Sequence, residues 1–246
     1  MSQIDPQKPV VTPFIGPNDP RLGPEAVLVS VEPDLTGLAK KAGLGGKPWR
    51  NGPFCRVYLK NHKKGGPCAA GPVMGAPQAA AALEMLIAWG VTDVVFAGWC
   101  GSIKEGLTAG SVVVPDFGAS DEGTSRHYGL DASGISRPSA TGRERLCGLL
   151  SDAGVSYASG GVWTCDALFR ETPEKIERFA QKGAVVVDME TAALFSVAAF
   201  HKIRLSAVLT VSDELFGHHW RAGFLDRPFG ESRRKISEAL CPIFSK

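Results

Sequence analysis

Short apolar runs alternate with longer helical patterns along most of the chain. The runs at residues 26–31, 93–97, 184–187 and 205–211 are rich in Val, Ala and Leu. Such nearly continuous apolar runs are typical of strands that are buried on both faces. The stretches between them carry helix signals, such as a proline suited to a first helical turn. This alternation predicts an α/β fold in which helices cover a largely buried sheet.

The same pattern predicts where each element lies. We expect strands at 26–31, 56–59, 93–97, 111–114, 157–163, 184–188 and 205–211. We expect helices from Asp34 to near Gly43, from Pro77 to Trp89, from Thr141 to near Ala153, and at 173–182, 192–200 and 228–240.

Turn signals divide these elements. Residues 98–101 form a glycine-rich sequence that is interpreted as a turn, and Pro115 is expected to end the strand before it. Residues 43–66 are predicted to be an irregular excursion or a hairpin. Residues 1–24 are expected to be a loosely ordered arm, and residues 25–246 a single domain.

Composition excludes several classes of protein. Among 246 residues, 27 basic and 25 acidic side chains leave a formal net charge of +2. Because so small an excess gives no bulk attraction to polyanions, we expect neither nucleic acid nor a membrane as a partner. No run approaches the ~18 apolar residues of a membrane span. The six cysteines lack metal-type spacing and no apolar signal segment precedes them, so we expect a cytoplasmic protein with reduced thiols and no metal.

Polar clusters follow three of the predicted strands, where open α/β sheets bind their ligands. They are Asp188-Met189-Glu190, Ser212-Asp213-Glu214 and the loop at 121–128. Each has a structural explanation of its own. Asp188 or Asp213 can cap a helix, and the loop can be a solvated surface.

Taken together and in this order, these blocks resemble the nucleoside phosphorylase superfamily. This group includes purine nucleoside phosphorylases, uridine phosphorylases and adenosylhomocysteine-type nucleosidases. The resemblance covers residues 26–224 and rests on Met74–Pro77, Gly98–Gly101, Asp121–Tyr128, Trp163–Ala167, Arg170–Thr172, Val187–Leu194 and Val211–Leu215. It implies one nucleoside phosphorylase-like domain with a central mixed β-sheet flanked by helices, and a homo-oligomer, either a dimer or a hexamer.

The resemblance also implies roles for the residues at the site. Glu190 would hold the ribose 2′- and 3′-hydroxyls, because a carboxylate accepts from two adjacent donors. Met189 would pack under the sugar. Asp213 would donate a proton to N7 of a purine, since a purine anion is a poor leaving group. Arg221 would assist it as a second catalytic residue.

Four further residues are expected to bind the substrate. Phe169 would stack on the base. His127 would reach the sugar 5′ region, from a neighbouring subunit. Gly98 and Trp99 of the glycine-rich sequence complete this set.

The phosphate-binding residues of the family are missing from the chain. After the first strand the chain has Val31-Glu32-Pro33-Asp34-Leu35, without the usual glycine and arginine, and Phe96 and Trp99 replace two further contacts. Leu35 also stands where hydrolytic members carry the glutamate that activates water, although Glu32 and Asp34 lie nearby. Replacement cations could come from the excursion: Lys47, Arg50, Lys63 or Lys64.

The expected function is phosphorolysis of the N-glycosidic bond of a purine-type nucleoside, to free base and pentose 1-phosphate. The enzyme would be a pentosyltransferase of purine salvage, with phosphate as co-substrate and no cofactor. Two alternatives stay open because of the missing phosphate contacts. One is a hydrolytic nucleosidase, and the other is a non-catalytic relative that binds a nucleoside.

Overall fold

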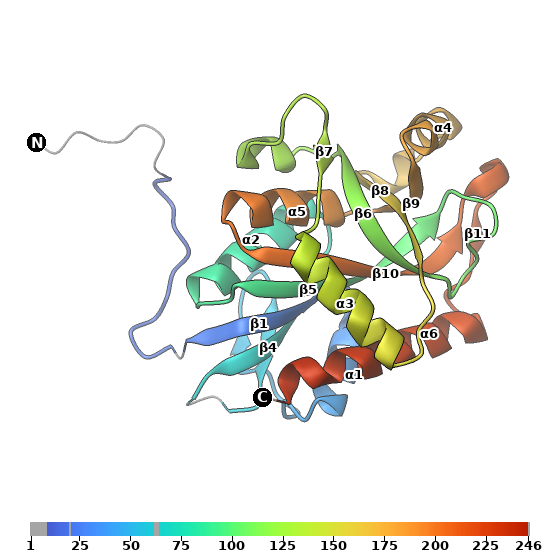
Figure 1. Cartoon of the computed structure of the whole chain (residues 1–246). Helices are drawn as coiled ribbons and strands as arrows, with labels where there is room; N and C mark the ends of the chain where they lie inside the picture. Colours follow the sequence, from blue (N-terminus) through green and yellow to red (C-terminus); the bar gives the residue numbers. More distant parts are fainter. Residues whose placement is uncertain (1–8, 20, 62–63, 246) are drawn as a thin grey trace, which may run out of the picture.

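The computed structural model describes residues 9–19, 21–61 and 64–245 (Figure 1). The strands are β1 (Leu22–Val29), β2 (Arg50–Asn51), β3 (Arg56–Leu59), β4 (Gly66–Gly71), β5 (Asp93–Ser102), β6 (Val112–Asp121), β7 (Ile135–Ser136), β8 (Ala158–Cys165), β9 (Ala184–Asp188), β10 (Arg204–Glu214) and β11 (Arg221–Ala222). The α-helices are α1 (Glu32–Lys41), α2 (Ala76–Ala88), α3 (Ala140–Asp152), α4 (Pro173–Gln181), α5 (Thr191–Phe200) and α6 (Arg227–Leu240). Short 3₁₀ turns are η1 (Ser125–Tyr128), η2 (Leu168–Arg170), η3 (Phe216–His218) and η4 (Cys241–Phe244).

The eleven strands of the described residues form one mixed sheet. Their order is β11-β10-β6-β8-β9-β5-β1-β4-β3-β2, with β7 beside β6. Strand β5 also pairs in parallel with β10, so β10, β6, β8, β9 and β5 close into a ring. Strands β1 and β4 continue the sheet in parallel from β5. The predicted α/β class and central mixed sheet are therefore confirmed.

Helices cover both faces of this sheet. In Figure 1, α2 and α5 lie together on one face, and α1, α3 and α6 lie on the other. The first face is packed by apolar side chains such as Leu83 of α2 and Phe195 of α5. The second is packed by Leu35, Leu146 and Ile236, one from each of its helices. None of the helices in the described ranges has the length and apolar character that a membrane span requires.

Two strands are longer than the local pattern predicts. Residues 98–101 are not a turn, because β5 continues to Ser102 with Trp99 paired opposite Thr210 of β10. Pro115 does not end β6 either. A register shift between Pro115 and Phe117 absorbs the residue that lacks an N–H, and β6 continues to Asp121.

Several element ends also differ from prediction. Helix α1 begins at Glu32, which puts Asp34 in its first turn rather than at the cap. Helix α3 is capped by Ser139, whose hydroxyl accepts from the Gly142 amide at 3.2 Å, and not by Thr141. Strand β4 was missed, since a sequence with glycine at both ends carries no strand signal. The strands predicted at 56–59 and 184–188 are confirmed.

The described part of the N-terminal arm contacts the domain through Asp19. Its carboxylate forms an ion pair with Arg50 and accepts from Nε1 of Trp89 at 3.2 Å. Strand β1 begins at Leu22, inside the range predicted for the arm. Residues 1–8 and 20 lie outside the described residues, and the domain boundary after residue 24 stays a prediction.

Candidate active site

A pocket of about 580 Å³ lies where six strands end. It is formed by residues at or just after the carboxyl ends of β1, β4, β5, β8, β9 and β10, which is where α/β sheets bind ligands. The volume falls within the roughly 300–1,000 Å³ typical of small-molecule sites. Its lining consists of Ser30, Val31, Val73, Met74, Trp99, Cys100, Gly101, Leu168, Phe169, Glu171, Val187, Asp188, Met189, Glu190, Ser212, Asp213, Leu215, Trp220 and Phe224.

Five residues that the sequence identified as site residues line this pocket. They come from four separate segments of the chain: Trp99, Phe169, Met189, Glu190 and Asp213. Strand pairing explains their convergence. The end of β9 pairs with the end of β5, and β5 pairs along its length with β10.

Glu190 lines the pocket and is only 5% exposed. Its Oε1 accepts from the backbone amide of Gly75 at 2.5 Å. Gly75 adopts φ 83° at the start of α2, a conformation that favours glycine. Burial, and then the nearby charge of Asp188, raises the pKa of Glu190 to about 8. Glu190 therefore tends to hold a proton at neutral pH.

Asp188 serves the structure around Glu190. Its carboxylate accepts from the Thr164 hydroxyl at 2.7 Å, from the Thr191 amide at 2.9 Å, and from the Thr191 hydroxyl. Burial raises its pKa to about 6 although these donors oppose the shift. The contacts with Thr191 hold the first residue of α5, but the N-cap position belongs to Glu190, so the prediction that Asp188 caps the helix is wrong.

Asp213 is held by two donors near the end of β10. The Ser212 hydroxyl donates to its Oδ1 at 2.6 Å, and Nε1 of Trp220 donates to its Oδ2 at 2.9 Å. Arg221 does not line the pocket. Its guanidinium donates to Glu214 at 2.7 Å and to Asp226 at 2.6 Å. The side chain that contacts Asp213 is therefore Trp220, the residue before Arg221.

The remaining predicted residues lie apart from one another. Phe169 stands at the mouth of the pocket with 93% of its surface exposed. His127 is exposed on η1 and does not line the pocket. Gly98 lines a separate small cavity behind it, where an added Cβ would meet the Phe96 ring at 2.9 Å. The binding roles of these residues stay predictions.

Glu171 is a pocket residue to which the sequence assigned no role. It is half-buried, and within the described residues no hydrogen bond or ion pair reaches its carboxyl group. Burial, followed by the charges of Asp213 and Asp188, raises its pKa to about 7. A single acidic residue before a helix start is usually a surface residue, so the sequence signal was weak.

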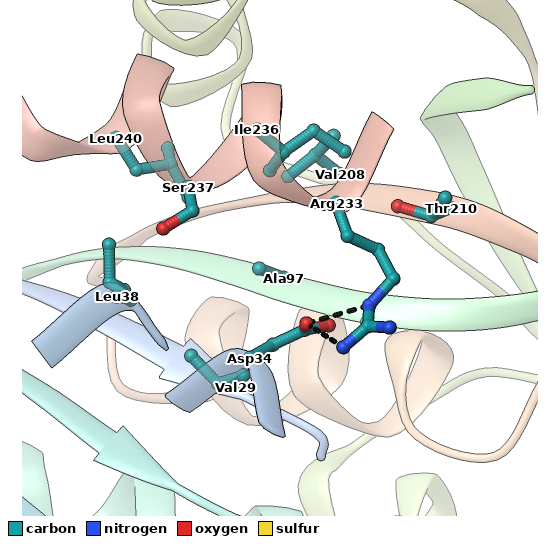
Figure 2. A pocket seen from close by; sticks show the side chains of 11 residues that line it. Val29, Asp34, Leu38, Ala97, Val208, Thr210, Arg233, Ile236, Ser237 and Leu240 are labelled. Atoms are coloured by element: carbon teal, nitrogen blue, oxygen red, sulfur yellow. Dashed lines mark hydrogen bonds and ion pairs between the residues drawn. The ribbon is translucent and has the colours of Figure 1, made fainter. Parts of the chain in front are cut away.

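An internal ion pair lies behind the pocket, beside a cavity of about 20 Å³. Figure 2 shows Arg233 reaching from α6 to Asp34 of α1. Nε1 of Trp99 donates to the other oxygen of Asp34 at 2.7 Å, and the Arg233 guanidinium lies 4.7 Å from the Trp99 ring. Trp99 is thus fixed between the pocket and the ion pair.

The pocket is acidic. Glu171, Asp188, Glu190 and Asp213 line it, and none of its lining residues in the described ranges is Lys, Arg or His. Of the replacement cations considered, Arg50 is paired with Asp19, while Lys47 and Lys64 do not line the pocket. Lys63 lies outside the described residues.

Comparisons of the sequence and of the fold with known proteins agree with one another. The family model of the phosphorylase superfamily matches residues 24–245. A "purine nucleoside phosphorylase DeoD-type" of Bacillus cereus is 28% identical over 149 residues. That match covers 59% of this chain and 63% of the relative, so the chain spans less than two thirds of the relative's length.

Solved structures extend the comparison over the whole fold. A purine nucleoside phosphorylase of Toxoplasma gondii in complex with immucillin-H has a TM-score of 0.76 at 18% identity, over 92% of this chain and 91% of that one. An AMP nucleosidase of Bacteroides thetaiotaomicron has a TM-score of 0.69 at 25% identity, over 90% and 89%. Proteins with this fold therefore include both phosphorylases and nucleosidases.

Proposed function

Since the chain belongs to the phosphorylase superfamily, we propose that it cleaves the N-glycosidic bond of a purine-type nucleoside with water as the acceptor. The observation that carries this proposal is that no cationic side chain is present among the described residues that line the pocket, whose titratable groups include four carboxyl groups. The sequence favoured phosphorolysis over hydrolysis, and this proposal reverses that order. Phosphorolysis becomes the second candidate.

The acidic lining disfavours phosphate as co-substrate. A phosphate dianion brought into this pocket loses hydration and meets no cationic side chain of the described lining, at a cost of several kcal/mol per unmatched charge. Arg233 lies on the other side of Trp99 from the pocket, but Asp34 already pairs with it and the Trp99 ring lies against its guanidinium. Water carries no charge and needs none of these partners.

A buried hydroxyl offers a place for the acceptor water. Ser30 lies directly after β1, is 8% exposed and lines the pocket. Its Oγ has no hydrogen-bond partner within the described residues. Because an unpaired buried hydroxyl costs free energy, a water molecule bound there would be stabilised.

The nucleoside itself suits the other residues of the pocket. Glu190 would accept from the ribose hydroxyls, with Met189 beside the sugar, and Phe169 would stack on the base. As the bond between C1′ and the base nitrogen breaks, negative charge collects on the base. A carboxylic acid beside the base would then lower the barrier by protonating it.

Phosphorolysis remains the second candidate because of one observation. The curated relative that matches at 28% identity carries the name of a purine nucleoside phosphorylase. That relationship favours a phosphate acceptor if a cation outside the described lining completes the site. The two candidates differ in a single requirement, which is added phosphate.

The test is release of free base from inosine, adenosine, guanosine and uridine, each with and without phosphate. We expect release from the purine nucleosides in phosphate-free buffer, and loss of that release in Glu190→Gln. Release only with phosphate would favour phosphorolysis. No release from any of the four would contradict both candidates and favour the non-catalytic alternative.

A further inference from the structure

A cationic side chain lies just outside the pocket, behind one of its walls. Arg233 of α6 does not line the pocket, but its guanidinium lies 4.7 Å from the centroid of the Trp99 ring, which does. The cavity of about 20 Å³ beside Arg233 (Figure 2) has room for a water molecule and not for a phosphate. The Trp99 indole thus separates the pocket from a guanidinium, a group well suited to binding phosphate.

Contacts with three elements hold the Trp99 indole in this position. Its Nε1 donates to Asp34 of α1 at 2.7 Å, and its ring lies edge-on to the Phe229 ring of α6, with centroids 4.9 Å apart. The backbone of Trp99 pairs with Thr210 of β10. Because rotation of the indole would break the first two contacts, the closed arrangement is favoured.

Asp34 joins the indole to the guanidinium. One of its oxygens accepts from Trp99, and the other accepts from Nε of Arg233 at 2.7 Å. A guanidinium paired with a carboxylate attracts a second anion less strongly than an unpaired one does. The indole therefore blocks access to Arg233, and Asp34 offsets its charge.

The buried hydroxyl of Ser30 lies on the strand end next to Trp99. The Ser30 amide donates to the carbonyl of Ala97 at 3.1 Å, two residues before Trp99 on β5. Its Oγ has no hydrogen-bond partner in the part of the chain that the structure describes. The hydroxyl and the indole both line the pocket, so this side offers a hydrogen bond to water but no cation to phosphate.

We propose that Trp99 determines the acceptor, by closing the pocket against phosphate on the side of Arg233 and leaving the side of Ser30 to water. The inference rests on the proposed function. In hydrolysis the bond between C1′ and the base nitrogen breaks, and its electron pair leaves with the base. The water oxygen bonds to C1′, one water proton stays on the new hydroxyl, and the other goes to the base. A phosphate oxygen could form the same bond to C1′ only if phosphate bound beside it.

The experiment measures binding of inorganic phosphate by isothermal titration calorimetry, without nucleoside. The double variant Trp99→Ala with Asp34→Asn removes the wall and the counter-ion, and a triple variant adds Arg233→Met. Trp220→Ala is the matched control, since this indole also lines the pocket but contacts Asp213. We expect no phosphate binding by the wild type or the control. The double variant should bind phosphate at least about tenfold more tightly than the triple variant, the factor that one charge-assisted hydrogen bond contributes.

Three binding results would overturn the inference. Saturable binding by the wild type would show that Trp99 does not exclude phosphate. No gain in the double variant would mean that another feature excludes it. An equal gain in the triple variant or in Trp220→Ala would show that the effect does not depend on Arg233. If circular dichroism shows that the double variant does not fold, Trp99→Leu with Asp34→Asn replaces it, because leucine keeps an apolar contact with Phe229.

Base release from inosine separates this inference from the proposed function. If the wild type releases base from no nucleoside, the proposed function fails, while calorimetry still decides whether Trp99 excludes phosphate. Release by the wild type that requires phosphate would overturn both. In the double variant we expect added phosphate to yield ribose 1-phosphate, which the wild type should not form.

Discussion

Asp188 and Glu190 are separated by one residue, yet they have different partners. Asp188 receives three hydrogen bonds from Thr164 and Thr191. Glu190 receives the Gly75 amide and otherwise faces the pocket. Asp188 therefore stabilises the fold, and Glu190 is available to bind a ligand.

The raised pKa values of Glu190 and Glu171 predict how stability depends on pH. Both groups hold their proton more tightly in the folded chain, about 8 and about 7 against an ordinary 4.5. Their contribution to stability is therefore complete below pH 4.5 and is lost as the pH rises through 7 and 8. We expect the free energy of unfolding in urea to fall as the pH rises from about 4.5 to about 8.

Glu190→Gln should reduce that fall, since glutamine does not titrate. Glu174→Gln is the control, because this exposed side chain is outside the pocket. Equal pH dependence in the wild type and Glu190→Gln would contradict the prediction.

At the scale of elements, α1 and α6 are joined by Asp34 and Arg233. Both side chains are mostly buried, with 23% and 21% exposed. The Trp99 indole donates to the same carboxylate, and its ring lies against Phe229 of α6 with centroids 4.9 Å apart. The cluster therefore connects two helices to β5 directly behind the pocket.

Removing the cation of this cluster should destabilise the fold. Arg233→Met leaves Asp34 with the indole donor alone, and we expect a loss of about 1–3 kcal/mol in the free energy of unfolding. The double variant Asp34→Asn with Arg233→Met should recover part of it, as no charge stays unpaired. Urea unfolding measures both.

The control on the same helix is Arg227→Met. Arg227 is exposed and pairs with Glu231 one turn along, so a change within about 0.5 kcal/mol is expected. A loss in Arg233→Met no larger than in this control would contradict a structural role for the ion pair.

At the scale of the whole molecule, apolar side chains surround the mouth of the pocket. Met74, Phe169 and Trp220 are 69%, 93% and 67% exposed, and Leu225 nearby is fully exposed. Exposed apolar surface of this kind commonly marks an interaction site.

The resemblance predicts that the chain forms a dimer or a hexamer. We expect light scattering coupled to size-exclusion chromatography to give a mass that is a multiple of 26.0 kDa. A monomer at all concentrations would contradict the homo-oligomer and the shared role of His127.

Pattern and motifs were enough to predict the class of fold and five of the residues that line the pocket. Apolar runs that alternate with helical periods leave few arrangements other than a covered sheet. Because ligands gather at strand ends, Met189, Glu190 and Asp213 could be identified from their positions directly after apolar runs. Their side chains do line one pocket.

Tertiary structure decided which side chains meet. The local pattern could not predict that Trp220 rather than Arg221 reaches Asp213, or that Glu171 faces the pocket without a partner in the described residues. Nor could it predict the pairing of Asp34 with Arg233, 199 residues later in the chain. Hydrophobic periodicity indicates which side chains of one helix or strand are buried. The protonation of a carboxyl group depends instead on donors and charges that only the packed fold brings together.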